Sequence, residues 1–372
     1  MNKLISFILI FTPFVSTFEW KVARFFKSVK STDSIFSIRL RLLKLMKENL
    51  VVLNLWMEKE YKGYKNLKKS SRKKFYKNSE EIVKLFFDEY LKLPKLKNPY
   101  FNDEKLDFIY SIMRFLKPNK YYKYIKSASF FKLLKDPNKE TLEGDCNQIV
   151  TLYIFLFSRK YNIEDLEIKL LPDHVCLHYK GIDIEATNGQ FCKYDKYDHI
   201  LPITEILSTN LLDITDFREK TRKINARVFL KSAQLSFAIS SLREIVEKNL
   251  EYAYHNLAIS TMKEKNFKSA LFYSSKLKDK SLYSNIKRNY AINLYERKSY
   301  EKALKISKEI RDLELERACL GAMFNELRKK VENVKTISDV KLNRKTYNKM
   351  YDLALKMGDR TLADQIKKSY FI

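Results

Sequence analysis

A switch from helical to strand-like periodicity in the middle of the chain most constrains its fold. The apolar run at 149–157 predicts a buried helix, which Cys146 opens after a glycine turn. Apolar and polar residues then alternate at 174–179 and 182–187, as in strands with one buried face. Between them, Lys180-Gly181 predicts a two-residue hairpin turn. A helix followed by a hairpin indicates an α+β domain in which an antiparallel sheet packs on the helix.

Three residues with the chemistry of a thiol-nucleophile enzyme occur in order along this region: Cys146, His174 and Glu185. In such an enzyme the histidine takes the thiol proton, and the carboxylate orients and stabilises the imidazolium. A thiol at a helix N-terminus also has its pKa lowered by the helix dipole and the free amides. The three residues are therefore candidate catalytic residues.

The hairpin decides which of these side chains can meet. On its first strand His174, Cys176 and His178 point to one side. With a two-residue turn, His178 pairs with Asp183, and His174 lies diagonally from Glu185, within reach of a long side chain. The hairpin thus brings base and acid together, whereas the thiol has to arrive by tertiary packing.

The segment 136–146, Asp-Pro-Asn-Lys-Glu-Thr-Leu-Glu-Gly-Asp-Cys, resembles the entry to the catalytic helix of transglutaminase-like proteins, a branch of the papain-like thiol fold. In that family an apolar helix follows the cysteine, then a strand that starts at His and a second strand that carries Asp or Glu. The resemblance covers roughly residues 85–210. It implies three roles: Cys146 as nucleophile, His174 as base and Glu185 as orienting acid.

Two carboxylates compete for the third role. Asp183 shares a face with Glu185, and Asp is the commoner acid in the family. We favour Glu185 because Glu-Ala-Thr-Asn-Gly resembles the family's acid–x–Thr segment better. The chain departs from the family at Asn147-Gln148, where an acidic residue or a small polar pair often follows the nucleophile. We expect His174→Ala to slow acylation at Cys146 far more than Glu185→Ala, and Asp183→Ala to do little.

Further cysteines and histidines raise the alternative of a zinc site. Cys176, His178, Cys192 and His199 lie close in sequence. The alternating His-x-Cys-x-His spacing is not usual for structural zinc, and no C-x₂-C pair occurs. We therefore expect neither a metal nor a cofactor, with Cys176 packed behind the site and Cys319 in the core of a later helix.

From about residue 220 onwards helical periodicity replaces the strand pattern. A set of small and aromatic residues recurs after 33 residues (291 − 258, 300 − 267 and 303 − 270): Ala258, Phe267 and Ala270, then Ala291, Tyr300 and Ala303. An earlier, weaker copy has the same spacing of 12 between its alanines: Ala226, Leu235 and Ala238. The pattern is similar to tetratricopeptide repeats, in which helix pairs approach closely around an aromatic wedge. That similarity implies a surface for a protein or peptide partner.

The N-terminal part shows three features. Residues 4–15 form a short apolar run that fits the core of a signal peptide, a membrane anchor or a buried helix. Residues 35–57 predict an amphipathic helix, and the Lys- and Arg-rich stretch at 65–77 predicts a linker or an exposed helix. A helix start near Ser79 marks the catalytic domain. The expected domains are 1–78 (helical and basic), 79–215 (catalytic) and 216–372 (helical repeats).

A net charge of +27 favours an anionic partner, either nucleic acid or a membrane surface. However, Lys greatly exceeds Arg and Gly is scarce, a composition that spreads basic residues over the whole chain, and no nucleic-acid-reading motif is present. We therefore expect no specific nucleic acid, and membrane contact only through residues 4–15. The four unevenly spaced cysteines do not form a disulfide framework, which favours the reducing cytoplasm.

Three classes of function follow. The first is a thiol enzyme that acts on amide or peptide bonds, by hydrolysis as a cysteine protease or amidase, or by acyl transfer to an amine. The backbone amide of Cys146 would contribute to its oxyanion site. The second is a catalytically inactive scaffold whose repeats bind a partner protein. The third is a basic protein that binds a membrane surface or nucleic acid, with salt-sensitive affinity and no reactive thiol.

Overall fold

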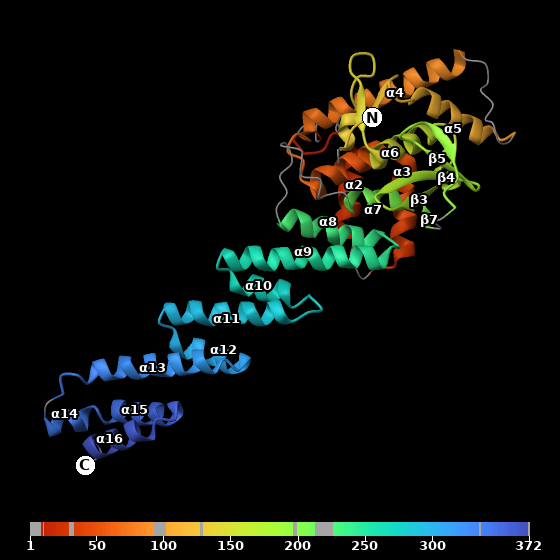
Figure 1. Ribbon diagram of the computed structural model, residues 1–372. Coiled ribbons are helices and arrows are strands. Elements are labelled where there is room, and N and C mark those ends of the chain that lie inside the picture. Colours follow the sequence, from red (N-terminus) through yellow and green to blue (C-terminus); the bar gives the residue numbers. More distant parts are fainter. Residues whose placement is uncertain are drawn as a thin grey trace. The chain divides into compact units, whose positions relative to one another are not determined.

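The computed structural model describes residue 9 and the following ranges: 11–29, 33–92, 102–126, 129–195, 199–212, 226–334 and 336–370. The chain forms two compact units, Met1–Ala253 and Tyr254–Ile372. The described elements of the first unit are helices and strands, and those of the second are helices (Figure 1). The expected boundaries at 78/79 and 215/216 do not coincide with this division.

The described part of the first unit contains a five-stranded antiparallel sheet. The strand order is β6-β5-β4-β3-β7, with these bounds: β3 Glu167–Leu171, β4 His174–Tyr179, β5 Ile182–Glu185, β6 Gln190–Cys192 and β7 Ile200–Pro202. The predicted hairpin of β4 and β5 is confirmed. Lys180 and Gly181 form its turn with φ of 47° and 81°, and His178 lies opposite Asp183. Positive φ at both turn residues matches the twist of the flanking strands.

Helix α6, Cys146–Phe157, begins at the predicted residue and packs on β4. A small parallel pair of strands, β1 (Tyr122–Tyr124) and β2 (Leu142–Gly144), leads directly into it. From Gln148 onwards every residue of the helix is buried. Because the helix is apolar on all sides, it forms the centre of the unit rather than a surface layer.

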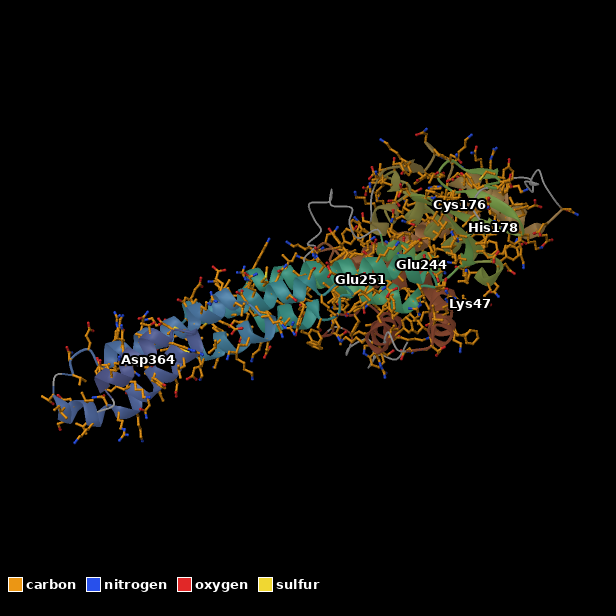
Figure 2. The ribbon with its side chains drawn as sticks, turned by 60° about the horizontal axis from the view of Figure 1, so that its bottom comes forward. Lys47, Cys176, His178, Glu244, Glu251 and Asp364 are labelled. Carbon is orange, nitrogen blue, oxygen red and sulfur yellow. The ribbon has the colours of Figure 1, made fainter. Side chains whose placement is uncertain are left out.

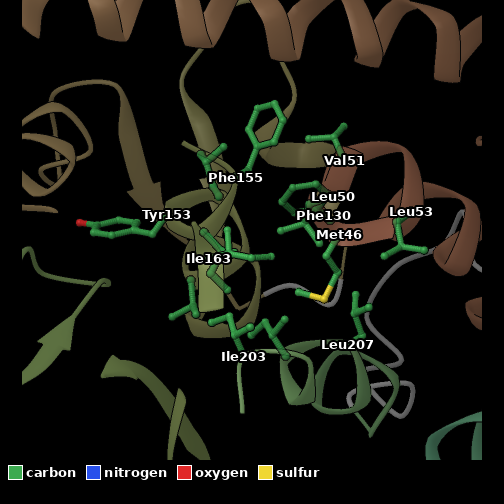
Figure 3. Packing of buried hydrophobic residues seen from close by; sticks show 14 of the residues in the cluster. Met46, Leu50, Val51, Leu53, Phe130, Tyr153, Phe155, Ile163, Ile203 and Leu207 are labelled. Carbon is green, nitrogen blue, oxygen red and sulfur yellow. The ribbon is translucent and has the colours of Figure 1, made fainter. Parts of the chain in front are cut away.

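One hydrophobic core joins α6 to the N-terminal helices. Helix α3, Ile35–Met57, spans the predicted range, with a break at Asn49, whose side chain accepts a hydrogen bond from the amide of Val52 at 3.0 Å. Residues 50–57 are all buried. Figure 3 shows side chains of α3 beside those of α6 and of the segments around them: Met46, Leu50, Val51, Leu53, Phe130, Tyr153, Phe155 and Leu207. The N-terminal helices therefore share the core of the expected catalytic region.

The Lys- and Arg-rich stretch at 65–77 is not a linker. Helix α4, Lys69–Lys92, runs through it, so Ser79 lies inside a helix and not at the start of one. Arg72 is only 1% exposed, and its guanidinium donates to Glu19 at 2.6 and 3.0 Å and to two backbone carbonyls at 2.7 Å each. The helix therefore begins at Lys69 and not near Ser79 as expected, and its buried arginine ties α4 to helix α2, Thr17–Ser28.

The other helices of the first unit have these bounds: α2 Thr17–Ser28, η1 Glu58–Lys62, α5 Glu104–Phe115, η2 Phe130–Leu133, η3 Ile163–Asp165, α7 Glu205–Leu212 and α8 Ala226–Ile239. Helix α9, Arg243–Lys263, contains the division between the two units. Glu205 of α7 is fully buried, and its carboxylate ties α7 to α3 and to the turn between α8 and α9. It accepts hydrogen bonds from the side chains of Arg39, Ser208, Ser240 and Ser241.

Half of the apolar run at 4–15 lies outside the described residues. Its described end packs on the first unit: the ring of Phe14 lies 5.1 Å from that of Trp56, and the amide of Val15 donates to Glu19 at 2.6 Å. Among the described helices, none combines the length and the apolar character needed to cross a membrane.

The described helices of the second unit continue from α9 with these bounds: α10 Phe267–Ser274, α11 Ser281–Glu296, α12 Tyr300–Ile310, α13 Leu313–Lys330, α14 Ile337–Leu342, α15 Arg344–Met357 and α16 Arg360–Tyr370. The 33-residue offset recurs in the turns before α10 and α12. Lys265 and Lys298, 33 positions apart, both have φ of 58°. The next amide in each turn, of Asn266 or Ser299, donates to the carbonyl five residues earlier at 2.9 Å. Identical turns therefore close two successive helix pairs.

The small and aromatic residues of the two sets lie at corresponding positions in these pairs. Their four alanines are fully buried: Ala258, Ala270, Ala291 and Ala303. The ring of Phe267 stacks on that of Tyr290 at 5.1 Å, so it packs between successive helices. The expected earlier copy is wrong, because its three residues all lie in the single helix α8: Ala226, Leu235 and Ala238. The spacing of these residues matches that of the repeat, but they lack the turn that separates the two helices of a repeat.

Candidate functional site

Cys146 is the first residue of α6, and a capping box holds this end of the helix. The side chain of Asp145 accepts hydrogen bonds from the amides of Asn147 and Gln148, at 3.1 and 3.5 Å. The side chain of Gln148 in turn accepts from the amide of Asp145 at 3.3 Å. The box leaves the amide of Cys146 outside these bonds, and its thiol is partly exposed. Both features suit a nucleophile at this position, because a helix N-terminus favours nearby negative charge.

His174 links the thiol to a carboxylate. Its Nε2 lies 2.7 Å from Oε2 of Glu185. Hydrogen bonding to Cys146, and then to Glu185, raises the pKa of His174 to about 10. Because Nε2 faces Glu185, Nδ1 is the ring nitrogen left for the thiol. The structure therefore brings Cys146, His174 and Glu185 together in that order, with an imidazolium between two groups that can carry negative charge.

Glu185 is held by more than His174. It is 4% exposed, and one of its carboxylate oxygens accepts from the amide of Thr187 at 3.2 Å and from its hydroxyl at 2.6 Å. The hydroxyl of Tyr194 donates to the oxygen that faces His174, at 2.9 Å. Burial raises the pKa of Glu185, but the hydrogen bonds from His174 and Thr187 outweigh it and lower the pKa below its usual value. The carboxylate thus stays ionised and aimed at the imidazole.

Asp183, the alternative acid, belongs to a separate buried network. Its carboxylate lies 2.6 Å from Nδ1 of His178 and accepts from Nζ of Lys169 at 2.9 Å and from the amide of Tyr194 at 2.7 Å. The amide of Gly181 donates to Nε2 of His178 at 3.2 Å, so Nδ1 carries the proton that points at Asp183. Figure 2 labels His178 and Cys176, which both lie on β4. The structure brings Asp183 to His178, and not to His174.

Tyr194 and Thr187 contact the site but were not among the candidate residues. Thr187 had a signal, since it is the threonine of the acid–x–Thr segment. No sequence pattern indicated Tyr194, because it lies after β6 and only tertiary packing brings its hydroxyl to Glu185. Its backbone is fixed by Lys169, which donates to its carbonyl at 2.8 Å, and by Asp183. Asp183 thereby supports Glu185 indirectly, by placing the tyrosine whose hydroxyl binds it.

The remaining cysteines and histidines have other surroundings. Cys176 is fully buried, and burial raises the pKa of its thiol. Cys192 is partly exposed, and burial raises its thiol pKa to about 11. Cys319 is buried in α13, and His199 is exposed. In the described part of the chain, no three His, Cys, Asp or Glu side chains are arranged to hold a metal ion.

No protein-family model, curated protein or solved structure matches this chain. The case for a function therefore depends on the geometry of Cys146, His174 and Glu185 and on the chemistry that this geometry permits.

Proposed function

We propose that this chain is a thiol acyl-transfer enzyme of the transglutaminase-like type, with Cys146 as nucleophile, His174 as base and Glu185 as orienting acid. The observation that carries the proposal is His174, which hydrogen-bonds Cys146 on one side and the buried Glu185 on the other. A histidine with a purely structural role would not require both a carboxylate and a thiol at a helix N-terminus as its partners. The arrangement matches the requirement for an activated nucleophile, a base beside it and a third group that orients the base.

In the proposed reaction, the Cys146 thiolate attacks the carbonyl carbon of an amide or peptide. The amide of Cys146 donates to the developing oxyanion, since the capping box leaves it outside its own bonds. The His174 imidazolium gives its proton to the leaving nitrogen, the carbon–nitrogen bond breaks, and a thioester remains. Water then attacks the thioester carbon while His174 takes the proton of the water. The carbon–sulfur bond breaks, the carboxylic acid leaves, and the Cys146 thiolate is regenerated beside the His174 imidazolium. We favour hydrolysis over transfer to an amine because water is always present.

The helical repeats of the second unit are proposed to bind a protein or peptide, as substrate or as regulator. Two turns of identical geometry and four fully buried alanines support a regular array of helix pairs of the tetratricopeptide type. All four cysteines are free thiols, which supports a reducing compartment such as the cytoplasm.

The test is the rate of alkylation of Cys146 by iodoacetamide from pH 4 to 9, followed by peptide mass spectrometry. The pKa of His174, about 10, keeps its imidazolium charged over this whole range. If Cys146 is the proposed nucleophile, it should therefore react at pH values where a free cysteine, with a pKa of about 8.5, reacts slowly. We expect rapid alkylation near neutral pH in the wild type and its loss in His174→Ala.

Cys192 is the control within the same protein. Its thiol is partly exposed and its pKa is about 11, so it should react only at the alkaline end of the range in both proteins. If Cys146 reacts as slowly as Cys192 and is indifferent to His174→Ala, the triad is inactive. The second hypothesis, a scaffold that acts through its repeats, would then be preferred.

A further inference from the structure

A groove with a basic rim runs between α2 and α3, in a part of the first unit that the proposed chemistry does not use. Its volume is about 420 Å³, within the range of small-ligand sites. Buried Phe25 and Leu45 line it together with Arg24, Arg41 and Lys44, whose side chains are exposed. An apolar floor beneath several cations differs from an ordinary solvated helix face.

The three cations at this rim are not neutralised. Within the described residues, Arg24, Arg41 and Lys44 form no ion pair with a carboxylate, whereas the neighbouring Lys21 pairs with Glu48. The guanidinium of Arg24 lies 4.8 Å from the ring of Trp20, and that of Arg41 lies 5.0 Å from the ring of Phe25. Nη2 of Arg41 also donates to the hydroxyl of Ser28 at 2.6 Å. Stacking on a ring holds a guanidinium in place and leaves its edge accessible to oxygen atoms, so the remaining N–H groups of Arg41 can still bind a phosphate.

Three large apolar side chains are exposed on the same two helices, and Trp20 among them lines the groove. Trp20 is 46% exposed, Phe36 69% and Leu40 45%. Phe36, Leu40 and Lys44 follow one another at intervals of four, so they lie along one face of α3. A single exposed apolar residue is normal, but three on the same two helices as three cations without an ion pair have the composition of a helix pair that lies in a membrane interface.

We propose that α2 and the first half of α3 form a docking surface for an anionic lipid bilayer. Trp20, Phe36 and Leu40 enter the boundary between headgroups and acyl chains, and the three cations of the rim bind lipid phosphates. This contact differs from the one expected through the apolar run at 4–15, because it needs negative charge in the bilayer. Each Lys or Arg near an anionic surface strengthens binding about fivefold.

A lipid surface fits these residues better than nucleic acid does. Single-stranded nucleic acid uses exposed aromatic faces on which bases stack. Here Arg24 covers the ring of Trp20 and Leu40 has no ring, so within the described residues Phe36 is the one member of the three with an exposed, uncovered ring. A bilayer, in contrast, accommodates aliphatic and aromatic side chains equally well beside cations.

The proposal is tested with the full chain, by co-sedimentation with phosphatidylcholine vesicles with or without phosphatidylserine. We expect salt-sensitive binding that requires phosphatidylserine. Arg24→Glu with Lys44→Glu should weaken it at least about 20-fold, because two attractive charges become repulsive. Phe36→Ser with Leu40→Ser should weaken it at any salt concentration. All four side chains are exposed, so the fold should survive, which far-UV circular dichroism verifies.

The controls are Lys84→Glu and Leu91→Ser on α4, which make the same types of change at exposed positions of the same unit. Both should bind vesicles like the wild type. The apolar run at 4–15 is present in every variant and cannot produce a difference between them. Equal binding by wild type and both double variants overturns the proposal, as does an equal loss in the controls. Binding to polyuridylate but not to vesicles would assign the surface to nucleic acid instead.

Discussion

At the scale of single residues, Asp183 and Glu185 show how two similar side chains on one strand are separated by their neighbours. They lie two positions apart on β5 and are both almost fully buried. Glu185 faces the histidine that contacts Cys146, while Asp183 is bonded to Lys169 and His178. The difference comes from the partners opposite each carboxylate, so the two should respond to mutation in different ways.

Asp183→Ala should destabilise the protein, although we expect it to do little to acylation at Cys146. Lys169 is only 6% exposed, and without Asp183 it would be a buried cation with no carboxylate partner. Breaking such a pair costs about 3–5 kcal/mol. Urea denaturation measures the loss, and adding Lys169→Met should recover much of it because no charge then stays buried.

Glu185→Gln is the comparison at the same scale. It keeps the shape of the side chain but removes the charge that faces His174, so it should slow alkylation of Cys146. If Asp183→Ala left the urea midpoint unchanged and slowed alkylation more than Glu185→Gln does, Asp183 would be the acid of the site.

At the scale of elements, the entry to α6 depends on the absence of one side chain. A Cβ added at Gly144 would lie 2.9 Å from Cγ of Leu133, closer than real Cβ atoms approach their neighbours, and 3.2 Å from Cβ of Gln148, which is tighter than most such contacts. Gly144 therefore serves the close packing of β2, η2 and the first turn of α6. This packing determines where Cys146, two residues later, is placed.

Gly144→Ala should lower the free energy of unfolding by about 1–3 kcal/mol, as overpacked core sites do, and should slow alkylation of Cys146. Gly321→Ala is the matched change. Gly321 lies within α13 with nothing within 4 Å of an added Cβ, so the substitution should stabilise by about 0.5–1 kcal/mol. Denaturant titration compares the two. Equal effects of both substitutions, with alkylation unchanged, would show that the packing around Gly144 is not restrictive.

At the scale of the whole molecule, the two units have separate hydrophobic clusters among the described residues. The cluster around α3 and α6 lies in the first unit, and one around Phe324, Tyr347 and Met350 lies in the second. Both tryptophans of the chain, Trp20 and Trp56, belong to the first unit. Tryptophan fluorescence therefore reports on the first unit, while far-UV circular dichroism reports on the helices of both.

We expect the two signals to give different transitions in denaturant, as chains with more than one unit commonly do. Phe324→Ala removes a side chain that is 7% exposed and should cost the second unit about 3–5 kcal/mol. It should shift part of the circular dichroism transition and leave the fluorescence midpoint in place. A single coincident transition that Phe324→Ala moves in both signals would contradict separate unfolding.

Features with local causes were predictable from the amino-acid order alone. The start of α6 at Cys146 follows from an apolar run behind Asp145, and the β4–β5 hairpin follows from Lys180-Gly181 between alternating residues. The bounds of α3 and the 33-residue offset follow from periodicity in the same way. In each case the deciding interactions join residues that are a few positions apart, so a short stretch of sequence is enough to predict the feature.

Features that depend on distant partners emerged only from packing. Arg72 can be buried because it pairs with the carboxylate of Glu19, 53 positions away. No local pattern in the sequence indicates this pairing. Two residues from other segments distinguish Glu185 from Asp183: Lys169 donates to Asp183, and Tyr194 donates to Glu185. The contact of Cys146 with His174 likewise joins a helix to a strand. These pairings are set by how elements pack in three dimensions, where sequence distance has no bearing on which charges and donors meet.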